Sequence, residues 1–435
     1  MEENNSFKPY VSADKVLPEF TVSSILIGII LAIVFGAANA YLGLRVGMTV
    51  SASIPAAVIG MGVYKLIGGF SSKKEETILE SNMVQTIGSA GESLAAGAIF
   101  TMPVLFLWAA EKKAQMPSIV EIALIAMIGG LLGICFMVPL RKALIVKEHG
   151  TLPYPEGTAC AEVLLAGQEG GANAAIVFIG MGISALAKFI VDGLKVVSNV
   201  VTIPIQKIHT EVSAEVYPAL ISVGYICGFK IASYMFAGAI LGWLVMIPAI
   251  YLFGANTILY PATVTIAEVW KSGGASGIWS NYIRYIGAGA VAAGGIISLV
   301  KSLPLICRTF VDALRGMMNK EAIGKEERTN RDMNMGLVLG MLAVLIILIA
   351  VLPVIPIGVL GAIIIVIFGF FFAAVSSRMV GLVGSSNNPV SGMAIATLLI
   401  TSLILKATGN SGASGMVAAI AIGSVICIVA AMAGD

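Results

Sequence analysis

The chain has 435 residues, of which 58% are hydrophobic and only 11% are charged, and its mean hydropathy is +0.97. Soluble domains carry about 25% charged residues, so this composition indicates a polytopic α-helical membrane protein. Long continuous apolar runs exclude a transmembrane β-barrel, whose strands alternate apolar and polar residues. The net charge of +2 gives no reason to expect a nucleic-acid partner.

The first 19 residues are polar and lack the charged and then apolar pattern of a signal peptide, so we expect them in the cytoplasm. Apolar runs follow that are long enough for a bilayer core of about 30 Å. They are Phe20–Leu44, Val46–Leu66, Glu80–Ala110, Ile119–Leu140, Ala174–Val191, Lys230–Phe253, Ile278–Val300, Met335–Leu352, Pro356–Val375, Val390–Leu405 and Met416–Ala431.

Two further runs, Ala159–Gly167 and Val216–Phe229, are too short to cross alone and are predicted as half-helices or re-entrant segments. The mixed segment Asp192–Glu215 is predicted to be peripheral. The predicted fold is an all-α polytopic membrane protein with about eleven full transmembrane helices and two short segments.

One sequence pattern occurs twice, in Phe35–Gly47 and in Phe372–Gly384. Both copies run from Phe and small residues, through an Arg, to Gly-Leu and a segment rich in Gly, Ser or Thr. Such repeats with interrupted helices are typical of transporters. We therefore expect two related membrane repeats, residues 20–300 and 335–435, joined by a charged cytoplasmic linker at 301–334. The second repeat is much the shorter and is expected to be truncated.

A polar stripe follows the second predicted span. Asn82, Gln85, Ser89 and Glu92 recur at helical spacing and share one face. An acid on such a stripe inside a membrane is costly and suggests a proton-accepting or solute-binding role. The alternative is a solvated helix end outside the bilayer. The segment is too long for one straight span, and its Gly88 and Gly91 are predicted to break it.

The segment Leu152–Thr158 cannot be helical throughout, because Pro153 and Pro155 each remove a backbone donor. The helix predicted after it would begin near Glu156, which is a candidate cap or a candidate solute contact. Tyr154 and Glu162 are the other candidates here.

The stretch Gly381–Met393 is unusually polar between two apolar runs. Irregular backbone survives at membrane depth only where protein or a water-filled cavity covers it. We expect it to be a cavity-lining break, and the alternative is a loop outside the bilayer. The candidate contacts in it are Asn387, Asn388 and Ser391, and the candidate breaks are Pro389 and Gly392. Arg378, just before it, is expected to snorkel to the membrane surface.

The sequence lacks the residue patterns of several functional classes. The five cysteines form no CxxC pair, so neither a disulfide framework nor a metal site is expected. No ATP-binding G-x-x-x-x-G-K-[ST] and no H-E-x-x-H motif occurs. We therefore expect no enzymatic activity and no cofactor.

Three motifs together resemble the oligopeptide transporter (OPT) family, and its prokaryotic branch related to the yellow-stripe-like metal-chelate transporters fits best. They are Asn82–Ser93, Gly150–Glu162 and Ser386–Met393. The resemblance implies a proton-coupled secondary transporter of small peptides or metal–chelator complexes in the cell membrane. Its expected partners are this solute, protons and the lipid bilayer, with further copies of the chain as an open possibility. A passive channel, a membrane-embedded enzyme and an inactive fragment of a longer transporter are the alternatives.

Overall fold

The computed structural model is mostly helical. It describes residues 10–46, 49, 51–68, 78–148, 152–169, 173–196, 200–215, 218–287, 289–290, 293–294, 297, 300, 304, 331–351, 358–385, 388 and 390–435. The chain divides into two compact units, Met1–Ala174 with Gly295–Asp435, and Ala175–Gly294. We call them unit 1 and unit 2.

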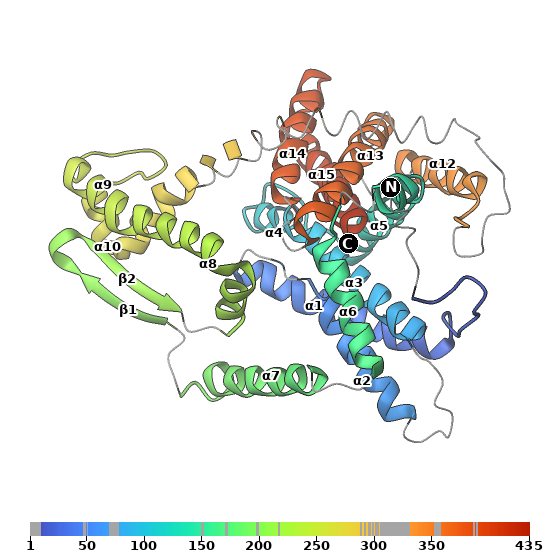
Figure 1. Ribbon diagram of the computed structural model, residues 1–435. Helices are drawn as coiled ribbons and strands as arrows, with labels where there is room; N and C mark the ends of the chain where they lie inside the picture. The colour runs from blue at the N-terminus through green and yellow to red at the C-terminus, as the bar shows by residue number, and fades with distance from the viewer. Residues whose placement is uncertain are drawn as a thin grey trace, which may run out of the picture. The chain divides into compact units, whose positions relative to one another are not determined.

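Unit 1 carries the helices on which the candidate site lies (Figure 1). They are α1 (Val22–Val46), α2 (Ser53–Gly68), α3 (Ile78–Ile99), α4 (Pro103–Ala110), α5 (Ile119–Arg141), the π-helical η1 (Lys142–Lys147), α6 (Pro155–Glu169), α12 (Met335–Val351), α13 (Gly358–Val383), α14 (Val390–Ala407) and α15 (Ala413–Gly434).

Unit 2 contains helices and one antiparallel two-stranded sheet. Its elements are α7 (Asn173–Lys188), η2 (Phe189–Gly193), β1 (Val200–Ile205), η3 (Gln206–Ile208), β2 (Thr210–Glu215), α8 (Pro218–Ile240), η4 (Leu241–Met246), α9 (Ile247–Gly254), α10 (Ile266–Ile278) and η5 (Trp279–Ile283). A capping box starts α10, and the hydrogen bonds from Thr265 lower the pKa of Glu268.

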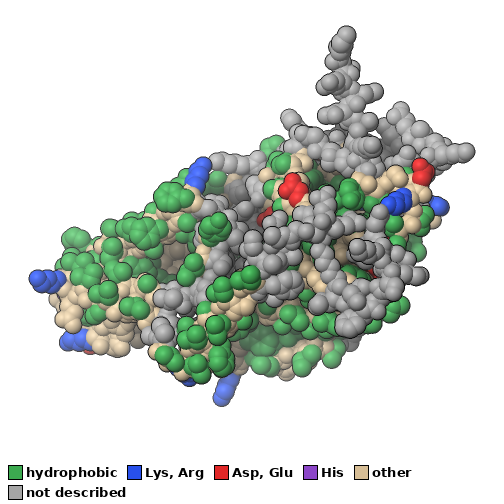
Figure 2. All heavy atoms as spheres, turned by 60° about the horizontal axis from the view of Figure 1, so that its bottom comes forward, with side chains coloured by type: hydrophobic (Ala, Val, Ile, Leu, Met, Phe, Trp, Pro, Cys, Tyr) green, Lys and Arg blue, Asp and Glu red, His purple; other side chains and the backbone are tan. Residues whose placement is uncertain are grey.

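Five described helices are long and apolar enough to cross a membrane, and the pair α3 and α4 makes a sixth if it forms one span. Large apolar side chains are exposed on many of the helices, as the green areas of Figure 2 illustrate. Water would not favour such a surface, whereas lipid does. The chain is a membrane protein with several apolar spanning helices.

The helix α15 forms the centre of unit 1, and most of its side chains are buried. It packs against α3, α5, α13 and α14. Glycines allow the close approach: a Cβ atom on Gly97 would lie 2.5 Å from the Cα of Ile428, and one on Gly133 would lie 3.0 Å from the Val429 oxygen. Small residues at such contacts are the usual device of membrane helix packing.

The helix α3 corrects one prediction. It runs without interruption through Gly88 and Gly91, so the break expected there is wrong. The chain bends by 42° after Ile99 instead, where Pro103 starts α4. The glycines serve packing, because a Cβ atom on Gly91 would overlap the Ala32 carbonyl of α1.

The polar stretch after α13 is also shorter than predicted. Helix α13 continues to Val383 and α14 begins at Val390, so at most residues 384–389 separate the two helices. Gly392 lies inside α14 and is not a break, and Ser391 lies beside it in the same helix. Pro389 falls outside the described residues.

Two further boundaries differ from the sequence prediction. The predicted break between Val216–Phe229 and Lys230–Phe253 is wrong, because α8, η4 and α9 follow one another directly and Lys230 lies inside α8. The segment Asp192–Glu215, for which no strand was predicted, contains the hairpin of β1 and β2, with Val200 opposite Glu215 and Ile205 opposite Thr210. Branched residues in β1 favour the strand.

The contact of α3 with α15 gives a testable prediction. Replacing Gly97 with Ala should lower the thermal stability of the purified protein, by about 1–3 kcal/mol of unfolding free energy, because the new methyl group meets backbone atoms of α15. The matched control is Gly340→Ala on α12, where a Cβ atom would meet nothing within 4 Å. Equal melting temperatures for the two variants in detergent would contradict the packing argument.

Candidate functional site

The predicted polar stripe lies on α3, and its members differ in burial. Ser89 and Glu92 are 3% and 6% exposed. Gln85 is half-buried and Asn82 is exposed. The stripe therefore runs from the surface of unit 1 into its interior, and the acid lies at the buried end. This geometry favours the prediction of an internal polar site over that of a solvated helix end.

The Glu92 carboxylate accepts hydrogen bonds from two segments that pack on α3. The Asn39 amide of α1 donates to Oε1 at 2.8 Å, and the backbone N–H of Ala52, just before α2, donates to Oε2 at 3.4 Å. Both donors are neutral. They satisfy the oxygens and position the acid without supplying a positive charge.

A second acid, Asp435, directly follows α15 and faces the same stripe. Its Oδ2 accepts hydrogen bonds from the hydroxyls of Ser89 and Ser93, the latter at 2.7 Å. Ser89 also shares a hydrogen bond of 2.8 Å with Ser53 of α2. Hydroxyl groups thus connect α2, α3 and the end of α15 in one hydrogen-bonded chain.

A third acid, Glu156, lies in the first turn of α6. The hydroxyl of Ser385, in the link between α13 and α14, donates to it. The neighbouring Gly384 has a φ of +88° and approaches Glu156 so closely that a Cβ atom there would lie 2.7 Å from Oε1. The charged forms of Glu92, Asp435 and Glu156 repel one another.

These groups border two hollows. The larger one has a volume of about 420 Å³ and lies among α3, α6, the end of α13 and the end of α15. It is lined by Ser53, Asn82, Gln85, Met137, Ile145, Tyr154, Glu156, Gly157, Cys160, Ala161, Leu164, Ser377, Val380, Gly384, Ser385, Met432, Ala433, Gly434 and Asp435. We call it the main cavity. Its size and its mixture of apolar walls with a few polar groups are typical of small-molecule sites.

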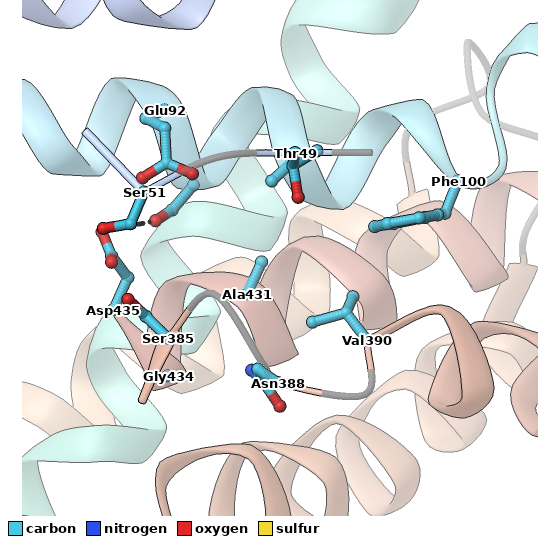
Figure 3. A pocket seen from close by; sticks show the side chains of 12 residues that line it. Thr49, Ser51, Glu92, Phe100, Ser385, Asn388, Val390, Ala431, Gly434 and Asp435 are labelled. Carbon is cyan, nitrogen blue, oxygen red and sulfur yellow. Dashed lines mark hydrogen bonds between the residues drawn. The ribbon is translucent and has the colours of Figure 1, made fainter. Parts of the chain in front are cut away.

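The smaller hollow has a volume of about 50 Å³ and shares Asp435 and Ser385 with the main cavity. Figure 3 shows Glu92 projecting from α3 on one side of it and Asn388 on the opposite side. Thr49, from the connection before α2, also lines it. The link before α2 and the link after α13 therefore both contribute to this small pocket.

The candidate residues from the sequence are only partly brought together. Asn82, Gln85, Tyr154 and Glu156 line the main cavity. Glu92 and Asn388 line the small pocket. Ser89 reaches the acids through hydrogen bonds. Glu162 has an exposed side chain and lines neither hollow, while Asn387 lies outside the described residues.

Asp435, Ser93 and Asn39 are among the contributors that were not sequence candidates. Ser93 is four residues after Ser89, so helical spacing could have extended the stripe to it. Asn39 lies inside the first copy of the repeated pattern, where a polar residue among small apolar ones is a usable signal. The sequence around Asp435 does not indicate a role in the site, because Asp435 meets the polar stripe only through the packing of α15 against α3.

The prolines of the α6 entrance act as predicted. Pro153 precedes the helix and Pro155 is its first residue, a position that needs no backbone donor. Tyr154 between them has a φ of +42°, and its N–H donates to the Gly381 oxygen at 2.9 Å. The Thr158 N–H then donates a hydrogen bond to the Tyr154 oxygen at 2.8 Å, which closes the first turn of the helix.

The described residues contain no group of three His, Cys, Asp or Glu side chains placed to hold a metal ion. Cys135, Cys160 and Cys427 are free thiols. The chemistry that the described residues bring to the cavity is accordingly that of carboxylates, hydroxyls and amides, which bind solutes by hydrogen bonds and charge.

Comparisons with known proteins show which family the chain resembles. The chain is 32% identical over 393 residues to a Haemophilus influenzae protein provisionally named an oligopeptide transporter; the match covers 86% of this chain and 58% of that relative. A sequence model of the family described as OPT oligopeptide transporter protein matches residues 19–435. Both descriptions are of transporters and neither is of an enzyme. The chain belongs to the OPT oligopeptide transporter family.

Proposed function

We propose that the chain takes part in the transport of small peptides across the cell membrane and that the main cavity receives the solute. The observation that carries the proposal is the position of this cavity at two interruptions between described helices of unit 1, the start of α6 and the link after α13. Freed backbone groups and half-helix ends at such breaks are the usual solute contacts of transporters.

The lining of the cavity suits a peptide. Carboxylates of Glu156 and Asp435 can hold an amino group, and the amides of Asn82 and Gln85 can pair with peptide groups. Apolar walls from Met137 and other residues leave side chains of different kinds room to fit. Metal–chelator complexes are the second solute class that the family resemblance suggests.

Proton coupling is part of the proposal. Glu92 is buried, the described contacts of Glu92 and Asp435 are with neutral donors, and the charged forms of the two acids repel each other. Burial and repulsion of this kind favour binding of a proton to one of the two acids. Because Asp435 borders both hollows, a proton bound there can influence solute binding next to it.

We further propose that α1–α3 and α13–α15 are inverted repeats. The offset that aligns Phe35 with Phe372 also carries the first residue of α2, Ser53, onto the first residue of α14, Val390. α3 and α15 are antiparallel, since Gly97 meets Ile428 while Thr101 bonds to Ser424. In this proposal an approximate two-fold axis through the crossing would relate the two three-helix groups, and rocking one against the other would open the cavity alternately to each side.

The proposal is tested by uptake of a radiolabelled alanine tripeptide into proteoliposomes, with and without an imposed pH gradient. We expect uptake that the gradient accelerates and that unlabelled tripeptide competes away. Competition by a ferric–chelator complex but not by peptide would assign the second solute class. Uptake indifferent to the gradient would remove proton coupling, and the absence of any solute movement would overturn the transport role.

Glu92 provides the first mutational prediction. Glu92→Gln keeps the shape of the side chain and removes its proton exchange, so gradient-driven uptake should fall by roughly tenfold or more, as for loss of a proton-transferring group. Glu162→Gln on α6 is the matched control, because that side chain is exposed and lines neither hollow. Normal, pH-dependent uptake in Glu92→Gln would exclude this acid from coupling.

Gly384 provides the second mutational prediction. Gly384→Ala should impair tripeptide uptake severely, because its methyl group would displace the Glu156 carboxylate from its place at the cavity. Any substitution at this φ of +88° also strains the backbone by about 1 kcal/mol. Gly409→Ala controls for that strain, since Gly409 has a φ of +82° and nothing within 4 Å of its Cβ position. Equal losses of uptake in both variants would show that strain alone is responsible.

A further inference from the structure

An ion pair connects two walls of the main cavity without lining it. Arg378, in the last turns of α13, binds Glu148, which lies between η1 and α6, with 2.7 Å between Nη1 and Oε1. The side chains are 17% and 30% exposed. Arg378 was expected to snorkel to the membrane surface, and its partner shows a different use of its charge. Neither residue is among those that border the cavity.

The ion pair is accompanied by a backbone tie a few residues further on. The N–H of Tyr154 donates to the Gly381 oxygen at 2.9 Å, and the Tyr154 hydroxyl donates to the Leu144 oxygen of η1 at 3.2 Å. Leu144 and Leu152 pack with Ala374 of α13 in a small apolar cluster. The segment between α5 and α6 is thus attached to the outer side of α13 over several turns.

Both attached segments continue into the cavity. After Tyr154 the chain enters α6, whose Glu156 and Cys160 line the cavity on one side. After Arg378 the chain supplies Val380 and Gly384 to another side. The ion pair between Glu148 and Arg378 therefore joins the two chain segments that lead into these walls.

We propose that Glu148 and Arg378 form a latch that holds the α6 wall of the cavity against the α13 wall, and that its release opens the cavity between them. The inference rests on the proposed role of the main cavity as the solute site. Both residues are positioning residues, since they act through Tyr154 and Glu156. A pair that is partly exposed is suited to this task, because water can solvate the charges when they separate and the net cost of separation is modest.

Cys160 offers a native reporter of the latch. Its thiol borders the cavity, is 5% exposed, and lies 3.8 Å from the Ser53 oxygen. N-ethylmaleimide should therefore label it slowly in the wild-type protein in nanodiscs, with labelling at each cysteine followed by mass spectrometry. Glu148→Gln and Arg378→Gln should each accelerate labelling of Cys160 by roughly fivefold, the change in an opening equilibrium expected from loss of a partly exposed pair.

A charge exchange separates a latch from a general loss of packing. The double variant with Glu148→Arg and Arg378→Glu should restore slow labelling, whereas each of these changes alone should not. The matched control is Arg141→Gln, which removes a similar ion pair at the end of α5, between Arg141 and Asp332 at 2.5 Å; neither residue lines the cavity. Labelling of Cys160 should be unchanged in it.

Two buried thiols report unfolding in the same samples. Cys135 and Cys427 are 2% and 1% exposed in the core of unit 1. Selective acceleration at Cys160 supports the latch, while equal acceleration at all three cysteines would reduce the pair to an ordinary stabilising contact and overturn the proposal. Wild-type labelling rates in the single variants, or an exchange that fails to restore protection, would overturn it as well.

The labelling experiment needs neither solute nor a pH gradient, so its result is independent of the transport assay. A latch that behaves as expected in a protein that moves no tripeptide would refute the proposed function alone. Tripeptide uptake that is intact in wild type and in all latch variants, with unchanged labelling, would refute the latch alone.

Discussion

The close crossing of α3 and α15 is the contact on which the candidate site depends. Gly97 removes the side chain that would keep the two helices apart, and Thr101 pairs with Ser424 at the same crossing. Only this approach brings the end of α15 to the serines of α3. The same crossing relates the two three-helix groups that we propose as inverted repeats. The close packing that Gly97 permits therefore also determines which polar residues of α3 and α15 meet.

The interruptions of the helices follow from the need to pair every backbone group away from water. Pro155 starts α6 where its missing N–H is harmless, and Tyr154 turns its own N–H towards Gly381 of α13. The link after α13 in turn offers Ser385 to Glu156. Each interruption is thus stabilised by another, and the main cavity lies where they meet. Membership of the OPT family gives this arrangement its functional setting.

Charge is distributed unevenly through unit 1. The acids at the cavity accept hydrogen bonds from neutral hydroxyl and amide donors. Arg378, near the end of α13, forms an ion pair with Glu148, and neither residue lines the cavity. Neutral donors allow the acids to exchange protons or to accept a cationic group of a solute, whereas a salt bridge would hold them ionised. The ion pair is used where two segments must be held together.

The sequence by itself determined the class of protein, several of its long apolar helices and the polar stripe of α3. Hydropathy and 3.6-residue periodicity are local properties, and so are the prolines that start α6. The sequence reading misplaced the break in α3. A glycine that permits close helix packing cannot be distinguished in the sequence from a glycine that interrupts a helix. The sequence reading also missed Asp435, Asn39 and the partner of Arg378. Those were decided by tertiary structure alone, since they depend on which helices touch, and contacts between residues distant in the chain leave no pattern in either segment.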